Sequence, residues 1–449
     1  PAQVDEVVIS TDVAKKEEQK YDEKKPRDIF RQSAEIRDEQ QVEKPMLVHE
    51  EAPIADHFET ENDMDMNSAR GSEDAISDIP LGGTGVVGSM GVGGGGMAGC
   101  FGYRDGGGRR RAVKRFGGSK ATESAVEAAL AWLARHQDAS GNWDARKYGA
   151  KYKYDVGMTG LAVLAFLGAG YTHKNGKYRD NVKRAQEWLV KQQEDDGNIG
   201  GHGYYHAIAG LALAEAYGMT RDESLKAAAQ KAVDYSTQVH QVPYSGWRYK
   251  ARQKGDLSVS GWFVMQLKSA RVAGLKVDGA AFQGAQNFVD SCTSEDGWAG
   301  YTGKCRYRHS TTAVGMLCRQ FMGAHNTAEI LKKASGHLAA AVPEWNADEK
   351  GGGAHLANAR HTTFYYWYYG TLAMFQMGGD DWKKWNTALK PTLVKNQRKG
   401  GPLDGSLNDV DGSWDMLGGL DKKGGRVYTT ALGALSLEVY YRYLPMYTK

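Results

Sequence analysis

The chain has 449 residues, of which 41% are hydrophobic and 25% are charged, as is usual for globular proteins. No apolar run reaches the roughly 18 residues that suggest a membrane span, and residues 161–170 fit a buried helix better. The net charge of +3 conceals an uneven distribution, because residues 1–80 carry −12 and the remainder carries +15. The positive charge is scattered outside residues 109–115, and no base-stacking or groove-reading motif accompanies it, so nucleic acid is not an expected partner.

Two segments precede the regular part of the chain. Residues 1–81 form an acidic, poorly periodic arm whose composition stays disordered unless something holds it. We therefore expect the region 1–118 to engage the body of the chain, a partner protein or another copy of the chain. Residues 82–121 are glycine-rich and basic, with 16 glycines between residues 82 and 118, which indicates a linker. Residues 83–88 match GxGxxG but lack the flanking strand and helix that a dinucleotide site needs.

From residue 122 onward one unit recurs six times: an amphipathic helix, a polar turn and a helix that is apolar all round. Thr122 is the expected N-cap of the first amphipathic helix. The turns place an apolar residue at Trp143, Ile199, Trp247, Trp298 and Trp414. The apolar helices repeat a glycine at Gly160, Gly210, Gly261, Gly315, Gly370 and Gly433.

A glycine inside a helix costs about 1 kcal/mol against alanine, so its repetition needs a shared cause. Close approach between neighbouring helices is that expected cause. The pattern predicts an all-α fold, an (α/α)6 toroid over residues 122–449. Its apolar helices form a tight inner ring, and its amphipathic helices form the outer ring.

The turns at residues 136–143 (HQDASGNW) and 408–414 (NDVDGSW) resemble the QW repeats of the squalene cyclase and protein prenyltransferase β-subunit superfamily. The resemblance covers residues 122–449 and is strongest to bacterial members with an acidic, glycine-rich N-terminal region. It implies that the glutamines brace helix ends, that the tryptophans pack beneath them, and that an aromatic central funnel holds prenyl or terpenoid ligands.

The enzymatic motifs of that superfamily are not matched. The DxDD acid cluster, the DDxxD metal motif and the GCGEQ thioester are missing from the sequence. Asp290 and Cys292 have the spacing of the prenyltransferase zinc ligands, with His361 downstream, but they end an outer helix where the family's ligands begin an inner one. We therefore expect no metal and no cofactor. Cys292 and Cys305 bracket a turn and form either a disulfide or two free thiols.

The residues that begin the inner helices should meet at one mouth of the funnel, where they are candidate ligand-binding residues. They are Asp155, Tyr204, His206, Asp256, His309, His361, Tyr365, Tyr366, Trp367 and Tyr428. Three histidines suggest a metal site, but the repeat spaces them around the ring, which favours a polar rim that braces helix ends. The aromatic run 364–369 is more typical of a core than of a pocket.

The sequence is compatible with three functions. The missing motifs favour a non-catalytic toroid that acts as a binding or assembly module. The alternative is an isoprenoid-processing enzyme that uses the aromatic funnel. A glycan-acting barrel would need two facing carboxylates, for which Asp155 and Asp256 are the candidates. A chain that starts at Pro1 without methionine suggests processing and, with the resemblance, a bacterial protein outside the cytoplasm.

Overall fold

The computed structural model describes residues 101, 103–104, 106–243, 245–345 and 363–443. The described residues belong to one of two compact units, residues 63–449. The acidic arm, most of the expected linker and His361 lie outside the described residues, so the expectations for them stay untested.

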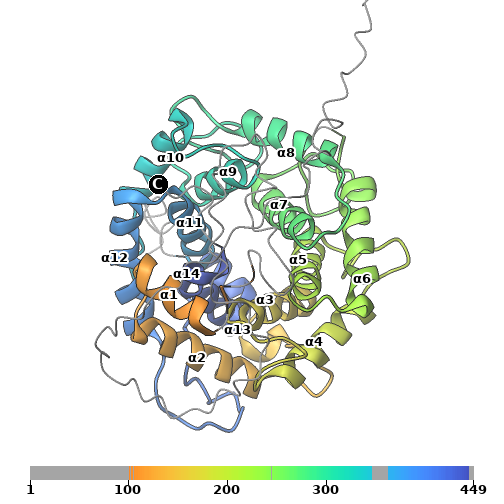
Figure 1. Ribbon diagram of the computed structural model, residues 1–449, viewed down its shortest axis with the longest axis vertical. Coiled ribbons are helices and arrows are strands. Elements are labelled where there is room, and N and C mark those ends of the chain that lie inside the picture. Colours follow the sequence, from red (N-terminus) through yellow and green to blue (C-terminus); the bar gives the residue numbers. More distant parts are fainter. Residues whose placement is uncertain (1–100, 102, 105, 244, 346–362, 444–449) are drawn as a thin grey trace, which may run out of the picture. The chain divides into compact units, whose positions relative to one another are not determined.

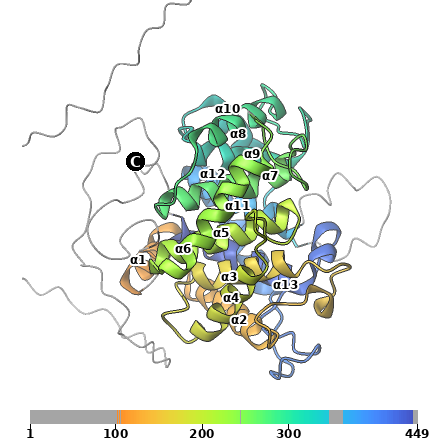
Figure 2. The same cartoon turned by 90° about the vertical axis from the view of Figure 1, so that its right-hand side faces the viewer.

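Within the described residues, twelve long helices alternate between an inner and an outer ring (Figure 1), which Figure 2 shows from the side. The inner helices are α3 (Asp155–Gly168), α5 (Gly203–Thr220), α7 (Leu257–Val272), α9 (His309–Phe321), α11 (Phe364–Met377) and α13 (Gly419–Leu437). The outer helices are α2 (Lys120–Arg135), α4 (Arg179–Lys191), α6 (Glu223–Asp234), α8 (Gly279–Cys292), α10 (Glu329–Ala339) and α12 (Gly379–Asn396). Each inner helix packs against the next, and α13 packs against α3, so the inner ring is closed. The predicted all-α, (α/α)6 toroid is confirmed.

Burial explains why the two kinds of helix take different places. Every residue of α3 is buried, because the helix has neighbours on all sides. In α4 only Val182, Ala185, Gln186 and Leu189 are buried, and their spacing places them on one face of the helix. The charged remainder of α4 faces water, as the amphipathic pattern predicted.

Glutamines join four of the turns to the next outer helix. The amide of Gln137 donates to the carbonyl of Gly141 in its own turn, at 2.8 Å, and to Asn181 of α4, at 2.9 Å. Gln193, Gln241 and Gln397 repeat this pair of bonds. The bracing role that the resemblance implies is therefore seen in four of the turns.

The indoles of the turns bond backwards, to the preceding outer segment. Trp143 donates to the carbonyl of Leu133 at 2.8 Å, and Trp414 donates to Leu393 at the same distance. Trp247 donates to Ser236 at 2.7 Å, in the π-helix η2 (Tyr235–His240) that extends α6. Each of these tryptophans is fully buried, so it satisfies a carbonyl at a helix end while filling the space beneath the turn.

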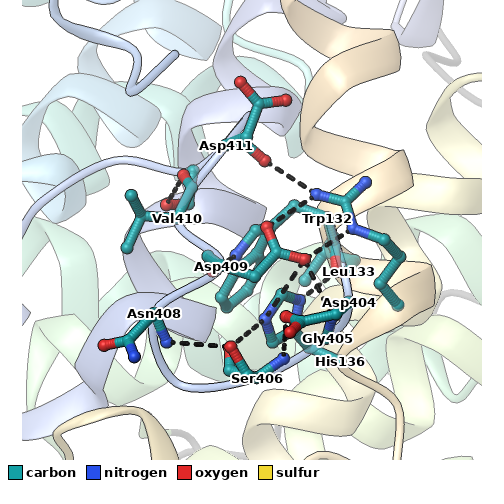
Figure 3. Close-up of polar contacts among 12 residues, drawn as sticks. Trp132, Leu133, His136, Asp404, Gly405, Ser406, Asn408, Asp409, Val410 and Asp411 are labelled. Atoms are coloured by element: carbon teal, nitrogen blue, oxygen red, sulfur yellow. Dashed lines mark hydrogen bonds and ion pairs between the residues drawn. The ribbon is translucent and has the colours of Figure 1, made fainter. Parts of the chain in front are cut away.

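The last turn closes the ring by contacting the first outer helix (Figure 3). Asp409 forms two bonds with Arg135 of α2, at 2.7 and 2.9 Å. The indole of Trp132 donates to the carbonyl of Asp409 at 2.7 Å, and the ring of His136 lies 3.2 Å from the carbonyl of Ser406. Burial of Asp409 alone would raise its pKa, but Arg135 and the N–H of Gly405 leave it lowered. These contacts link residues about 270 positions apart, so the sixth turn holds the circle shut.

The inner glycines share a position but not one cause. A Cβ on Gly160 would lie 3.2 Å from the backbone nitrogen of Ala209, so α3 and α5 approach closely there. At Gly370 and Gly433 the space is taken by the indoles of Trp385 and Trp414. The expectation of one shared cause is therefore wrong, since most of these glycines make room for a neighbouring side chain.

The stretch ahead of α2 contains a helix that was expected to be linker. Helix α1 (Gly106–Phe116) buries Ala112 and Val113, and the ring of Phe116 meets that of Phe375 edge to face at 5.1 Å. These apolar contacts order a glycine- and arginine-rich stretch, which composition alone does not reveal. The N-cap of α2 is Ser119, not Thr122 as expected, because Thr122 is the third helical residue of a capping box.

Helix α13 contains a break that matters for the site. Gly425 has φ +77°, and a Cβ there would lie 2.6 Å from the carbonyl of Tyr148, so only glycine fits. The break separates a short first segment, which carries Asp421, from the long segment of the inner ring. Among the described residues, no helix is both long enough and apolar enough to cross a membrane.

Candidate functional site

The inner helices all run in the same direction, which gives the ring two different faces. At one face the N–H of Gly203 bonds to the carbonyl of Tyr249, and Leu257 bonds to Tyr301, so α5 and α7 begin together. At the other face Gly168, at the end of α3, is in contact range of Glu438, which follows α13. We call these the start face and the end face.

Four tyrosines from three inner helices gather inside the start face: Tyr204, Tyr365, Tyr369 and Tyr428. The hydroxyl of Tyr204 donates to Ser258 Oγ at 2.5 Å, and Tyr365 donates to the Ser258 carbonyl at 3.2 Å. Burial raises the pKa of all four tyrosines well above the usual value. The structure thus brings together three of the predicted site residues, on α5, α11 and α13.

Asp256 joins this cluster as the N-cap of α7. Its Oδ1 accepts from the N–H of Val259 at 2.9 Å and from the Ser258 hydroxyl at 2.7 Å. Its Oδ2 is buried and has no hydrogen-bond partner among the described residues. Burial raises the pKa of Asp256, although the Val259 and Ser258 bonds oppose the rise. Capping therefore accounts for one of its two oxygens.

Asp421 is a site residue that sequence reasoning missed. It lies in the short first segment of α13, is fully buried, and neither of its oxygens has a hydrogen-bond partner among the described residues. Burial raises its pKa to about 8, although the nearby N–H groups of Leu417 and Phe364, which form no regular hydrogen bond with the carboxyl, oppose the rise. Burial and the neighbouring Asp421 carboxyl together raise the pKa of Tyr428, which places the acid beside the tyrosine cluster.

Below this layer, side chains of α7 and α11 meet across the interior of the ring. These two helices are separated by α9 on the circumference. The ring of Trp262 stacks on Tyr368 at 5.5 Å and meets Tyr369 edge to face at 5.5 Å. A Cβ on Gly261 would lie 3.0 Å from the Tyr369 hydroxyl. The interior at this depth is therefore filled by aromatic rings, as expected if residues 364–369 belong to the core and not to a pocket.

The remaining predicted site residues do not join the cluster. Asp155 accepts from the N–H of Ala145 at 3.3 Å. His206 accepts from the N–H of Ile199 at 3.1 Å, its other nitrogen lies 2.8 Å from Ser236 Oγ, and burial lowers its pKa to about 3. These two side chains brace their turns, in line with the polar-rim interpretation.

Three more predicted residues point toward the outer layer. His309 packs edge to face on Trp298 at 4.8 Å. Tyr366 donates to the carbonyl of Ala341 at 2.7 Å, and Trp367 packs on Trp345 at 6.0 Å. Tyr366 and Trp367 alternate with Tyr365 along one helix, so their Cβ atoms leave α11 in different directions.

The thiols and acids considered for a metal have other roles. Cys292 and Cys305 are free, so the disulfide alternative is wrong. Asp290 forms an ion pair with Arg319 at 2.6 Å, and Cys292 is buried. Among the described residues, no group of three or more His, Cys, Asp or Glu side chains is arranged to hold a metal ion.

The end face holds a cluster of buried charges. Glu215 of α5 accepts from Arg104 at 2.8 Å, from Arg442 at 3.3 Å and from the hydroxyl of Tyr443 at 2.6 Å. Arg442 also donates to the hydroxyl of Tyr368 at 3.0 Å. Burial alone would raise the pKa of Glu215, but the two arginines lower it to about 2. Arg104 precedes the toroid in the sequence and Arg442 follows its last inner helix, so these contacts hold both flanking segments against the inner helices.

The sequence matches no protein-family model, and it is similar to no curated protein. The structure resembles an inactive variant of α-1,6-mannanase GH76A from Salegentibacter in complex with α-1,6-mannotriose. The TM-score is 0.50 at 10% identity, over 71% of this chain and 99% of that chain. It also resembles type II terpene cyclase MstE from Scytonema, with a TM-score of 0.47 and 15% identity over 73% of this chain and 98% of that chain. Both neighbours are enzymes, but at these identities the likeness concerns the fold alone.

Proposed function

We propose that the start face takes up an isoprenoid-like ligand and that Asp421 acts on it as a general acid. The proposal rests on the environment of this carboxyl, which is fully buried beside Tyr428 and forms no regular hydrogen bond with a described residue. Burial therefore raises its pKa to about 8, and it keeps its proton at neutral pH. A protonated acid shielded from water can transfer its proton to an alkene or to a leaving oxygen. This is the enzymatic alternative that the sequence left open.

Backbone N–H groups near Asp421 favour the loss of its proton during the reaction. The N–H groups of Leu417 and Phe364 favour the ionised carboxyl, so they stabilise the carboxylate that proton transfer leaves behind. Phe364 begins α11 and Leu417 lies just ahead of α13, so the packing of these two inner helices holds both N–H groups in place. The site thus holds the proton at rest and supports its loss when a base arrives.

The tyrosine cluster suits the other product of protonation, which is a cation on the ligand. The faces of tyrosine rings attract positive charge, with a stabilisation of about 2 kcal/mol when water is excluded. Tyr428, Tyr204 and Tyr365 are buried or half-buried beside Asp421 or Asp256. Trp262 and Tyr368 pack against the inner side of the cluster and fill the interior there, so the proposed binding place is the start face itself.

A second candidate is the non-catalytic binding or assembly module. The meeting of α7 and α11 across the interior supports it, since a ring filled in this way is a rigid scaffold. The structural roles of Asp155 and His206 also support it. On this alternative a ligand or partner protein binds the start face and leaves unchanged.

The two candidates are separated by incubating the full chain with linear polyprenyl compounds in D2O. Protonation of an alkene by Asp421 transfers one solvent deuteron to carbon, and the resulting cation becomes a neutral product by losing one carbon-bound proton. The enzymatic proposal therefore predicts a product that is one mass unit heavier than its H2O counterpart. Asp421→Asn should abolish that product, whereas the exposed control Asp195→Asn should retain it. Binding without any solvent deuterium in the recovered compound supports the second candidate, and a product that survives in Asp421→Asn contradicts the assignment of the acid.

A further inference from the structure

We infer that the third and fourth turns form an oxyanion-binding site on the start face, in which Arg248 and Arg308 hold a phosphate or carboxylate group. The site adjoins the tyrosine cluster, since the ring of Tyr249 stacks on that of Tyr204 at 6.0 Å. It needs no proton from Asp421, so the inference goes beyond the proposed function. It concerns binding alone.

The two arginines meet on one aromatic platform. Arg248 follows Trp247 in the third turn, and Arg308 directly precedes α9. Their guanidinium carbons lie 5.9 and 5.7 Å from the ring centre of Tyr301. Arg248 also lies 5.6 Å from the ring centre of Tyr249, and the two tyrosine hydroxyls are hydrogen-bonded to each other. Arginines from two repeats therefore both lie over the ring of Tyr301.

The platform is held by backbone bonds to the inner ring. The carbonyl of Tyr249 accepts from the N–H of Gly203 at 2.8 Å, at the start of α5. The carbonyl of Tyr301 accepts from Leu257 at 2.8 Å, at the start of α7. Both tyrosines are only partly exposed. The arginines thus rest on fixed rings, which reduces the ordering cost of binding a ligand.

Neither guanidinium has an ion pair or a hydrogen bond with a residue that the structure describes, although both arginines are partly buried. Arg306, two positions before Arg308, shows the ordinary arrangement, since it is exposed and pairs with Asp296 at 3.1 Å. The acid that interacts with Arg248 at longer range is Asp256, whose Oδ1 already caps α7. Asp256 compensates Arg248 only at longer range, so an anion that bonds directly to the guanidinium groups would offset the remaining cost of desolvating them.

The chemistry of the guanidinium defines the ligand class. Its planar fork of N–H donors matches the paired oxygens of a phosphate or a carboxylate. The start of α9 adds to the attraction, since no side chain caps this 13-residue helix and its first turn carries partial positive charge. A phosphate ester and a small carboxylate both present anionic oxygens that suit these donors.

Isothermal titration calorimetry of the full chain with inorganic phosphate, pyrophosphate and citrate tests the inference. We expect at least one of these probes to bind, and we expect Arg248→Gln and Arg308→Gln each to weaken its binding by about tenfold or more. Preference for phosphate and pyrophosphate would identify a phosphorylated ligand, whereas preference for citrate would identify a carboxylate. Arg248→Lys keeps the charge and should retain part of the affinity, which guards against a glutamine variant that misfolds.

The control is Arg306→Gln, which removes a neighbouring exposed arginine and should leave the affinity unchanged. Asp421→Asn should also bind the anion like the wild type, so a failure of the proposed acid chemistry would not affect this result. Wild-type protein that binds none of the three probes would overturn the inference. An equal loss of affinity in Arg306→Gln would do the same, because binding would then reflect general positive charge.

Discussion

Glu215 at the end face and Asp421 at the start face are both buried carboxyl groups, but their partners differ. At the end face, Glu215 is matched by Arg104, Arg442 and the hydroxyl of Tyr443. At the start face, Asp421 is just as buried, but neither oxygen has a hydrogen-bond partner among the described residues. Burial is therefore common to both carboxyls, and their partners decide whether each holds a charge or a proton.

The pKa values express this difference. Two arginines lower the pKa of Glu215 to about 2, whereas burial raises that of Asp421 to about 8. Glu438 is an exception at the end face, since burial raises its pKa to about 8 even with arginines nearby. A matched buried charge stabilises structure, and an unmatched buried acid retains a proton that chemistry can use. Because Glu438 shares the raised pKa, a buried acid alone does not assign the site. The tyrosine cluster beside Asp421 is the reason that we regard the start face as the site and the end face as a structural closure.

The largest expected effect comes from breaking the end-face cluster. Glu215→Gln leaves the buried guanidinium groups of Arg104 and Arg442 without their counter-charge, which should lower the free energy of unfolding by about 3–5 kcal/mol. Urea unfolding followed by circular dichroism measures this loss. The control Glu223→Gln removes an exposed partner of Lys226 and should change stability by less than about 1 kcal/mol. A small effect of Glu215→Gln would mean that the two faces do not differ as described.

The pH dependence of stability separates the faces by sign. Asp421 has a folded pKa of about 8, above its ordinary 3.8, so its contribution is complete below pH 4 and is lost as the pH rises toward 8. Glu215 has a folded pKa of about 2, below its ordinary 4.5, so its contribution is present above pH 4.5 and is lost as the pH falls toward 2. Each group contributes at most about 1.4 kcal/mol per pH unit to the slope.

Urea unfolding between pH 4.5 and 8.5 therefore tests Asp421 directly. Asp421→Asn should make the decline of stability with rising pH less steep, because the amide does not titrate. Glu438→Gln should reduce the decline for the same reason, since its folded pKa is also about 8. An unchanged slope in Asp421→Asn would show that Asp421 ionises normally in the folded chain.

The smallest expected effect compares one hydroxyl from each face. Tyr443→Phe removes a bond to the charged Glu215 and should cost about 1.5–3 kcal/mol, whereas Tyr204→Phe removes a bond to the neutral Ser258 and should cost about 0.5–1.5 kcal/mol. Thermal unfolding of the two variants side by side gives the comparison. Equal losses would show that the charge of Glu215 adds nothing to the end-face bond.

The sequence predicted the ring because its cause is local and repeated. Each helix pair, its turn and its glutamine occupy a stretch of about 50 residues, so periodicity reveals them. The resemblance predicted that the turn glutamines brace helix ends, and their paired hydrogen bonds do so. Helix α1 was missed because Ala112, Val113 and Phe116 are too few to show periodicity in a run of glycine and arginine.

The chemistry of the two faces depends on contacts that periodicity cannot show. Glu215 meets Arg442, 227 positions away, so nothing near Glu215 in the sequence identifies its partner. Asp421 was missed because two glycine pairs, at residues 418–419 and 424–425, hid the short helical segment that carries it. An acid just ahead of the sixth apolar helix was the available signal. Tyr365 and Tyr366 are neighbours in sequence, yet only Tyr365 points into the cluster, and their order alone does not decide this.

Infrared difference spectroscopy of the wild type against Asp421→Asn at neutral pH shows directly whether the Asp421 carboxyl is protonated in the folded chain. The variant should lack a carbonyl band of a protonated carboxylic acid that the wild type shows, because Asp421 keeps its proton when folded. The comparison of Glu438→Gln with the wild type distinguishes the band of the other acid with a raised pKa. Loss of carboxylate bands alone in Asp421→Asn would mean that Asp421 is ionised at rest, and the start face would then lack the acid that the proposed function requires.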